Sequence, residues 1–489
     1  MTTRGFPGLR TPLVSVLGAN AISVAGTALS TVATPWFVLA TTGSAGRAGI
    51  VAFCATLPIA LSAVVGGPLI DRIGRRRVSV GSDLVCGAAV AAVPLLYLAG
   101  GLRFWMLCTL VAVSGLVHTP GDTARAVLVP DLAEHAGTSL ARAASLFDAV
   151  QRGARMAGAA LAGVLIAALG AQSALLFDAA SFGASALLVS VALRGLRAAQ
   201  PQRTATPVSA RAYASEMREG YAYVARTRLL LAVILMVLVI NGIDQGWVAV
   251  LLPVHAERHL GGATALGLLS ALFGAGGLAG ALVHGAVGHR FRRRTVFAVC
   301  VVLCGAPRFA VAGFTDSTVA LAVTMAVAGI AGGALNPILT TVIYGRVPPT
   351  LRSRVAGVST AGCELAMPLG GLGAGLLVDG AGLTTGLLVT GGAYLMASLC
   401  PAVFPAWRGL DEEPDDTGTS TADARGPGTD GSRADSSRTD GSRGGDGPRT
   451  AAPDARGPRR PAPRTTAHGP AAPTAPVSRS VPSPPTEAP

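Results

Sequence analysis

The chain has 489 residues, of which 51% are hydrophobic and 13% are charged, with a mean hydropathy of +0.53. Soluble domains usually carry about 25% charged residues, so this composition excludes an ordinary soluble protein and indicates a membrane protein. The net charge of +13 could indicate nucleic-acid binding, but the basic residues gather in alternate loops between apolar segments, which is a signature of membrane orientation. All 39 basic residues are arginine, and the lack of lysine excludes a lysine-bearing phosphate loop for ATP hydrolysis and a Schiff-base lysine within this polypeptide.

Apolar segments long enough to cross a membrane recur between residues 11 and 406. A spanning helix needs about 20 apolar residues, so this region has room for about twelve helices with their loops. We therefore expect an all-α polytopic membrane protein embedded in a lipid bilayer. The expected helices are 13–40, 48–70, 78–99, 104–128, 142–169, 172–193, 229–253, 263–288, 295–313, 317–344, 354–379 and 384–405.

Arginines beside the expected loops fall almost entirely on one side of the membrane. The other side holds only Arg47, Arg103, Arg258 and Arg308. Because cytoplasmic loops carry the excess of positive charge, we expect both termini in the cytoplasm and a multi-pass protein of the plasma or inner membrane.

The loop between the second and third apolar segments carries the most specific pattern, Gly67-Pro68-Leu69-Ile70-Asp71-Arg72-Ile73-Gly74-Arg75-Arg76-Arg77. Its four arginines cannot lie in hydrocarbon, so they place the loop at the cytoplasmic surface. Its glycines allow close backbone approach, and the Asp71 carboxylate can pair with an arginine or accept from a helix N-terminus.

This loop resembles the G-x-x-x-D-R-x-G-R-R-R segment between helices 2 and 3 of major facilitator superfamily transporters. The resemblance implies two pseudo-symmetric six-helix halves that expose a central cavity to each side of the membrane in turn. It also implies that Asp71 contacts helix 11 across the halves and holds the outward-facing state. The gating residues implied in this way are Gly67, Asp71, Arg72, Gly74, Arg75 and Arg76, with Arg290 in the second half.

The two halves repeat each other, as two halves related by an axis normal to the membrane would. Residues 67–76 align with residues 285–294, and the segment around Arg155 aligns with the segment around Glu364. The second loop copy carries His289 in place of the aspartate, so we expect a weaker gate there.

We divide the chain into a first half (1–193), a cytoplasmic connector (194–228), a second half (229–409) and a tail (410–489). In the connector, residues 209–226 predict an amphipathic helix along the inner membrane face, with Tyr213, Met217, Tyr221 and Val224 on one side. The tail is rich in Pro, Gly, Ser, Thr, Arg and Asp and has almost no large apolar residues. We expect it to be disordered, cytoplasmic and dispensable for transport.

Polar groups inside spanning segments are costly and mark candidate sites for coupling or substrate binding. In the superfamily, helices 1, 4, 7 and 10 line the cavity, and several of the candidates fall on them. Asp244 is the first choice for a carboxylate that exchanges a proton for a cationic substrate, and the alternative is a hydrated structural residue. The candidates are Asn20, Asp122, Arg125, Arg155, Asn241, Asp244, Gln245, Asn336 and Glu364.

Arg155 and Glu364 occupy related positions in the two halves. They could form an ion pair that breaks during the transport cycle, or they could simply cap helix ends. Exporters of this superfamily often carry an arginine within helix 4. This chain has none between Arg103 and Arg125, so its proton relay would be arranged differently, and we expect His118 to be a satisfied interior polar group.

We expect no metal and no cofactor, with the proton gradient as the driving force. His255 and His259 lie one helical turn apart, but no third ligand is nearby in sequence, which favours a solvated outer loop. The seven cysteines fall inside expected helices and indicate apolar packing rather than a disulfide framework.

The sequence around Arg142, residues 178–182 and residues 251–254 resembles the drug and siderophore exporter branch of the superfamily, which includes enterobactin and macrolide efflux proteins. The resemblance implies a monomeric secondary transporter, not an enzyme, that exports small amphipathic molecules in exchange for protons. Two alternatives stay open. One is uptake or facilitated diffusion of a metabolite, and the other is a non-transporting sensor or scaffold on the same fold, which would tolerate mutation of Asp71.

Overall fold

The computed structural model describes residues 7–194, 210–348 and 365–410, together with a few single positions between 351 and 362. Residues Met1–Asp416 group as one compact unit and Thr417–Pro489 as another. The predicted tail (410–489) lies outside the described residues except for Leu410, so its predicted disorder stays a prediction.

The described residues form helices and turns and contain no strand. The first half holds α1 (Pro7–Thr42), α2 (Ala45–Ile73), α3 (Arg75–Leu98), α4 (Phe104–His135) and α5 (Leu140–Ala192). α5 is two helices, because Gly170 at φ 81° breaks it between the expected segments 142–169 and 172–193. α4 runs to His135, past the predicted end at residue 128.

The second half begins after α6 (Ala210–Arg226). It holds α7 (Arg228–Gly246), a π-helical turn η2 (Trp247–Leu251), α8 (Leu252–His259), α9 (Ala263–Val287), a 3₁₀ turn η3 (Gly288–Arg290) and α10 (Arg293–Phe314). It ends with α11 (Thr318–Arg346), α13 (Met367–Ala381), α14 (Leu383–Val403) and a 3₁₀ segment η4 (Pro405–Leu410).

Ten described helices are long and apolar enough to cross a membrane. One of the ten is α5, which contributes two helices. The expected helix 354–379 includes α13, and most of its residues before α13 lie outside the described ones. The all-α membrane fold is therefore confirmed, and the described helices accommodate the predicted twelve.

The connector helix α6 matches the predicted residues 209–226 closely. Val224 is buried against Leu230 and Ile234 of α7, as an apolar face requires. Tyr221, which was predicted to share that face, is 52% exposed and therefore lies away from the contact. The side chains of Tyr213 and Met217 lie outside the described residues.

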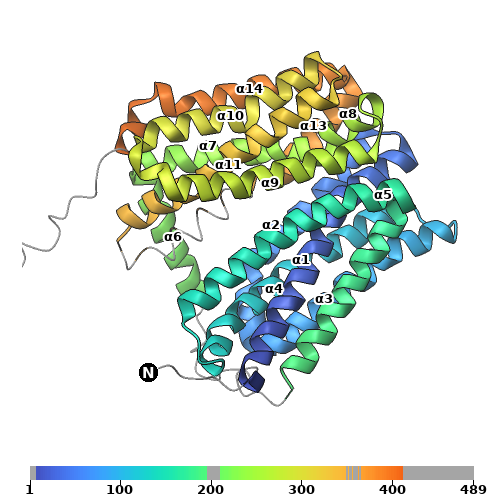
Figure 1. The fold of residues 1–489 in the computed structure, drawn as a ribbon, viewed down its shortest axis with the longest axis vertical. Helices are drawn as coiled ribbons and strands as arrows, with labels where there is room; N and C mark the ends of the chain where they lie inside the picture. Colours follow the sequence, from blue (N-terminus) through green and yellow to red (C-terminus); the bar gives the residue numbers. More distant parts are fainter. Residues whose placement is uncertain are drawn as a thin grey trace, which may run out of the picture. The chain divides into compact units, whose positions relative to one another are not determined.

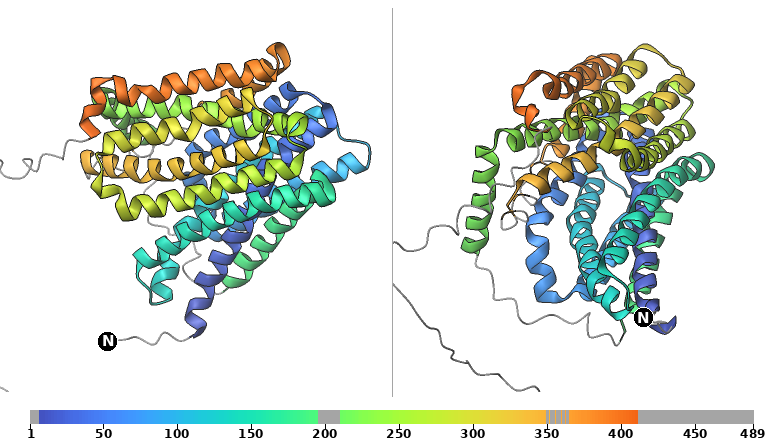
Figure 2. Two further views of the ribbon diagram at one scale, coloured as in Figure 1. Left: turned by 45° about the horizontal axis from the view of Figure 1, so that its top comes forward. Right: turned by 60° about the vertical axis from the view of Figure 1, so that its left-hand side comes forward.

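Helix packing repeats between the halves. In the first half α2 packs on α4, and α3 packs on α4 and α5; in the second, α9 packs on α11, and α10 packs on α11 and α14. α1 and α5 lie side by side, as do α10 and α14 (Figures 1 and 2). Small residues allow these approaches: a Cβ at Gly115 would overlap the Ala55 carbonyl, and a Cβ at Gly333 would overlap the Gly277 carbonyl.

The arginine-rich loops repeat as well. Arg76, at the start of α3, donates to the Ser190 carbonyl at 2.9 Å, near the end of α5. Arg294, at the start of α10, donates to the carbonyls of Pro401 and Ala402 at 2.9 and 2.8 Å, near the end of α14. An arginine thus neutralises the last carbonyls of the partner helix in both halves, where the helix dipole favours a cation.

The halves meet at the end of the bundle opposite these loops. α2 packs on α13, and α5 packs on α9. A Cβ at Gly49 would lie 2.7 Å from the Gly371 carbonyl, and one at Gly163 would overlap the backbone of Gly267. Asp379, in the last turn of α13, accepts from Ser44 Oγ at 2.9 Å and from the amides of Ala45 and Gly46 at 3.1 and 2.9 Å. It therefore caps α2 from the other half.

Candidate transport cavity and its charged networks

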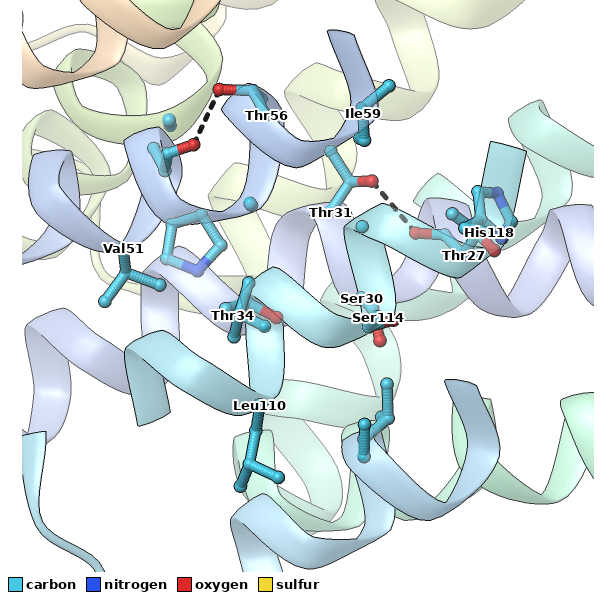
Figure 3. Close-up of a pocket in the computed structure, with 18 of the residues that line it drawn as sticks. Thr27, Ser30, Thr31, Thr34, Val51, Thr56, Ile59, Leu110, Ser114 and His118 are labelled. Carbon is cyan, nitrogen blue, oxygen red and sulfur yellow. Dashed lines mark hydrogen bonds between the residues drawn. The ribbon is translucent and has the colours of Figure 1, made fainter. Parts of the chain in front are cut away.

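A cavity of about 370 Å³ is lined by α1–α5 of the first half, together with Gln245, Val248, Ala249 and Met367 of the second. Its wall is mostly aliphatic, with side chains such as Val51, Ile59 and Leu110 (Figure 3). A few polar groups interrupt the apolar surface; they are Thr27, Ser30, Thr31, Thr34, Thr56, Ser114, His118, Asp178 and Gln245. A mostly apolar cavity with few polar groups fits small amphipathic molecules.

Asp178 is the one carboxylate among the residues that line this cavity. It lies in the second helix of α5 and is 1% exposed. Ser30 of α1 donates to its carboxylate, and Ser181 donates at 3.3 Å. No described cationic side chain forms an ion pair with it. Since two hydroxyls do not neutralise a carboxylate, Asp178 can take up a proton or face a cationic group in the cavity.

A charged network stands behind His118. His118 Nε2 lies 3.2 Å from Asp122, one turn along α4, and Asp122 also pairs with Arg125. Arg125 is fully buried, and its Nη1 donates to both oxygens of Asp83 at 2.7 and 2.8 Å. Ser185 of α5 donates to the same carboxylate at 2.7 Å. The network therefore ties α3, α4 and α5 together with charge-assisted hydrogen bonds.

This geometry corrects one prediction. Arg125 does not lie near the end of helix 4, because α4 continues for ten residues to His135; it is itself an arginine within that helix. His118 is a satisfied interior polar group, as predicted, since its Nε2 contacts Asp122, and it also lines the cavity.

Asp244, the predicted coupling carboxylate, is paired with Arg308 of α10. Arg308 is 2% exposed, so it does not belong to an outer loop and says nothing about orientation. Its guanidinium carbon lies 5.2 Å from the ring centre of Trp247 and 5.1 Å from that of Phe309. Phe273 and Tyr394 complete an aromatic surround at 5.9 and 5.7 Å. These rings stabilise the cation.

The other predicted cavity residues lie in different surroundings. Gln245 lines the cavity, whereas Asn20 is buried away from it with no hydrogen-bond partner among the described residues. Asn241 is half-buried, and Asn336 is exposed. Arg155 is also exposed, and Glu364 lies outside the described residues, so their proposed pairing stays a prediction.

The gating loop is only partly described. Gly74 has φ 96° and is the single residue between α2 and α3, which explains why glycine is needed there. Arg75 pairs with Asp131 of α4, and Arg72 and Arg290 are exposed. The side chains at positions 67 and 71 lie outside the described residues, so the contact predicted between Asp71 and helix 11 stays untested.

The segment around His255 differs from the predicted solvated loop. It forms α8, and His255 is 1% exposed. A third potential ligand, Asp316, lies in space beside His255 and His259, although it is distant in sequence. All the described cysteines are free, which agrees with the prediction that they serve apolar packing rather than a disulfide framework.

Four charged residues were missed as site residues: Asp83, Asp178, Arg308 and Asp379. A sequence signal existed for three of them. Asp83, Asp178 and Arg308 are isolated charges inside expected spanning segments, and the rule applied to Asp244 applies equally to them. Asp379 lies at the end of an expected helix, and only the fold brings it to α2.

Comparisons with known proteins agree with this fold. The family model of the Major Facilitator Superfamily matches residues 16–261 and 234–466. The chain is 34% identical over 408 residues to the multidrug efflux pump Tap of Mycobacterium tuberculosis, covering 83% of this chain and 96% of that protein. It is 22% identical over 404 residues to macrolide efflux protein A of Streptococcus pyogenes, covering 80% and 95%.

Solved structures are similar in fold. The nucleoside transporter NupG superposes with a TM-score of 0.66 at 12% identity, covering 80% of this chain and 98% of that one. A D-xylose–proton symporter superposes with a TM-score of 0.58 at 16% identity, covering 82% and 98%. The chain belongs to the Major Facilitator Superfamily. It is therefore a multi-pass membrane transporter rather than an enzyme.

Proposed function

We propose that this protein exports small amphipathic compounds across the cell membrane in exchange for protons, by alternating access of its two halves. The observation that carries the proposal is Asp178, a buried carboxylate in a mostly apolar cavity that has hydroxyl partners and forms no ion pair with a described cationic side chain, although His118 is close enough to interact with its charge. The two relatives named above are efflux proteins by name, which supports export as the direction.

Competition between the compound and a proton for the Asp178 carboxylate couples compound export to proton entry. From the cytoplasmic side, a compound with a cationic or hydrogen-bond-donating group enters the cavity and faces the ionised carboxylate. From the outer side, a proton binds the carboxylate and removes the charge that held the compound. Because the same group cannot hold both, the inward movement of a proton accompanies the outward movement of a compound.

The charges behind the cavity serve as scaffolding in this scheme. The Asp83–Arg125–Asp122 network has two carboxylates for one guanidinium, so it is neutral only when His118, beside Asp122, carries a proton. The Asp244–Arg308 pair is neutral as a whole and positions α10 without a change in protonation. His118 lies between the first network and the cavity and can pass a proton toward Asp122.

Alternating access requires the contacts at the closed end to separate. By the distribution of arginines, the end that carries Asp379 and Gly49 faces outward and both termini lie in the cytoplasm. The structure then corresponds to a state closed toward the outside. Opening this end breaks the hydrogen bonds from Asp379 to the N-terminus of α2. Each molecule contains both halves, so a monomer suffices.

Everted membrane vesicles with an imposed proton gradient test the proposal. Dyes, macrolides and siderophores are added in turn, and compound accumulation and gradient dissipation are followed together. We expect accumulation of at least one amphipathic compound in the wild type, and its loss in Asp178→Asn but not in the exposed control Glu134→Gln. Uptake in the opposite direction, or no movement of any compound by correctly inserted protein, would contradict export and favour the two alternatives named above.

A further inference from the structure

A group of metal-ligating side chains lies at the end of the bundle that carries Asp379, apart from the transport cavity. His255 and His259 stand one turn apart on α8, and their rings are stacked with centres 5.2 Å apart. Asp316, from the turn between α10 and α11, lies with its Oδ1 3.0 Å from Nδ1 of His259. One potential ligand atom from each of the three side chains lies within 4.8 Å of the other two.

The burial of His255, with both ring nitrogens unpartnered, is a second indication that a ligand binds here. The residue is 1% exposed, and neither ring nitrogen has a hydrogen-bond partner among the described residues. A neutral imidazole has one donor and one acceptor nitrogen, and leaving both unsatisfied in the interior is energetically costly. A metal ion bound to the acceptor nitrogen would remove one of these costs.

We propose that His255, His259 and Asp316 form a binding site for a divalent transition-metal ion of the zinc type. Histidines at i and i+4 on one helix face are a common pair of zinc ligands, and a carboxylate from a second segment is a common third. Two ligand atoms bound to tetrahedral zinc lie about 3.4 Å apart, given bonds of about 2.0–2.1 Å. The three side chains therefore reach this geometry with small rotations, because two of them are on the surface.

The ligand chemistry and exposure define the ion further. Two imidazoles and one carboxylate suit Zn²⁺, Ni²⁺, Co²⁺ or Cu²⁺, whereas Mg²⁺ and Ca²⁺ prefer all-oxygen sites. His259 and Asp316 are 39% and 67% exposed at their side chains, so an ion can enter from solvent and keep water as the fourth ligand.

Metal binding would join two segments of the second half. α8 lies at the end of helix 7 and contacts α1 of the first half, and the α10–α11 turn holds Asp316. An ion held by both segments would stiffen the part of the second half against which the first half closes. The proposal of this metal site does not rest on the proposed direction of transport or on the proposed coupling ion.

The test uses the full chain in detergent, purified with an affinity tag that contains no histidine and stripped with a chelator. Zn²⁺ binding is measured by competition with a chromophoric chelator, and Co²⁺ is added to record its visible absorption. We expect one Zn²⁺ per chain, a tetrahedral Co²⁺ spectrum without thiolate charge-transfer bands, and no competition by Mg²⁺. His259→Ala and Asp316→Ala should each weaken binding at least about tenfold. His135→Ala, at an exposed position elsewhere, should change nothing.

His259 and Asp316 lie at the surface, so both variants are expected to fold, and size-exclusion profiles with thermal unfolding check this directly. Zn²⁺ should raise the unfolding temperature of the wild type and of His135→Ala, and of neither site variant. Failure of the wild type to bind, or equal binding by folded His259→Ala and Asp316→Ala, would overturn the proposal.

Discussion

If the Asp244–Arg308 ion pair has a structural role, removing one partner should lower the stability of the protein by a measurable amount. Arg308 is 2% exposed, has one carboxylate partner among the described residues, and is surrounded by four aromatic rings. Removing one partner of a buried pair costs about 3–5 kcal/mol, because the other charge is left uncompensated. The Asp244 side chain is 34% exposed, so solvent screens part of this loss and we expect about 2–3 kcal/mol for Asp244→Asn.

The double variant separates a charge effect from a packing effect. Replacing a buried ion pair by apolar residues of similar volume is often neutral, so Asp244→Leu with Arg308→Met should recover most of the stability lost by either single change. The measurement is a double-mutant cycle on unfolding of the purified protein in detergent, followed by tryptophan fluorescence. We expect a coupling energy of at least about 2 kcal/mol, because the loss in the double variant should be smaller than the sum of the two single losses by at least this amount. Single-variant losses that simply add in the double variant would refute the reasoning, since they would show that the two groups do not stabilise each other.

Three further changes test the closed end and the gating loop. Gly163→Val places a side chain against the backbone of Gly267, so export should fall at least tenfold with normal insertion. Gly183→Ala, in the second helix of α5, adds a Cβ that meets no neighbour and should transport like the wild type. Asp379→Ala removes three hydrogen bonds to the start of α2 and should destabilise the closed end by about 1–2 kcal/mol. Spin labels on the two halves should then show a longer mean distance between the halves. An unchanged distance distribution would contradict the capping role. Gly74→Ala requires an alanine at φ 96° and should lower the free energy of unfolding by about 1–2 kcal/mol, while Gly81→Ala in α3, which meets no neighbour, should leave it unchanged or raise it.

Helix positions could be predicted closely because the signal is local. A spanning helix must be continuous and apolar, so each one appears as an uninterrupted segment, and the arginine loops mark the turns. α10 was expected at 295–313 and spans Arg293–Phe314. The end of α4 was placed too early, because residues 129–135 are polar enough to resemble a loop and only their packing against α1 and α5 shows them to be helical.

The candidate site was less predictable, because it depends on which polar groups face one another. Asp244 and Asp178 are both isolated carboxylates in apolar helices, and the sequence alone does not distinguish them. The fold does, since Arg308 forms an ion pair with the first, whereas the described hydrogen-bond donors to the second are two hydroxyls. In the same way, Asp316 is 57 residues from His259 in the chain and reaches it only because α8 and the α10–α11 turn meet.

The pairs that span the halves were the least accessible to prediction. Nothing in the sequence indicates that Gly163 meets Gly267 or that Gly49 meets Gly371. Such contacts depend on the register between helices that belong to one conformational state. A sequence under selection for alternating access encodes more than one such register.

We have proposed that Asp178 couples compound export to proton entry. A direct test uses purified protein in proteoliposomes, with a compound gradient, no initial pH difference and a pH-sensitive dye in the lumen. We expect compound-driven proton movement in the wild type and in Glu134→Gln, and none in Asp178→Asn at equal reconstitution. Asp244→Asn, where it remains folded, should still move protons. Proton movement by Asp178→Asn at the wild-type rate, or its loss in Asp244→Asn alone, would contradict the proposed role of Asp178.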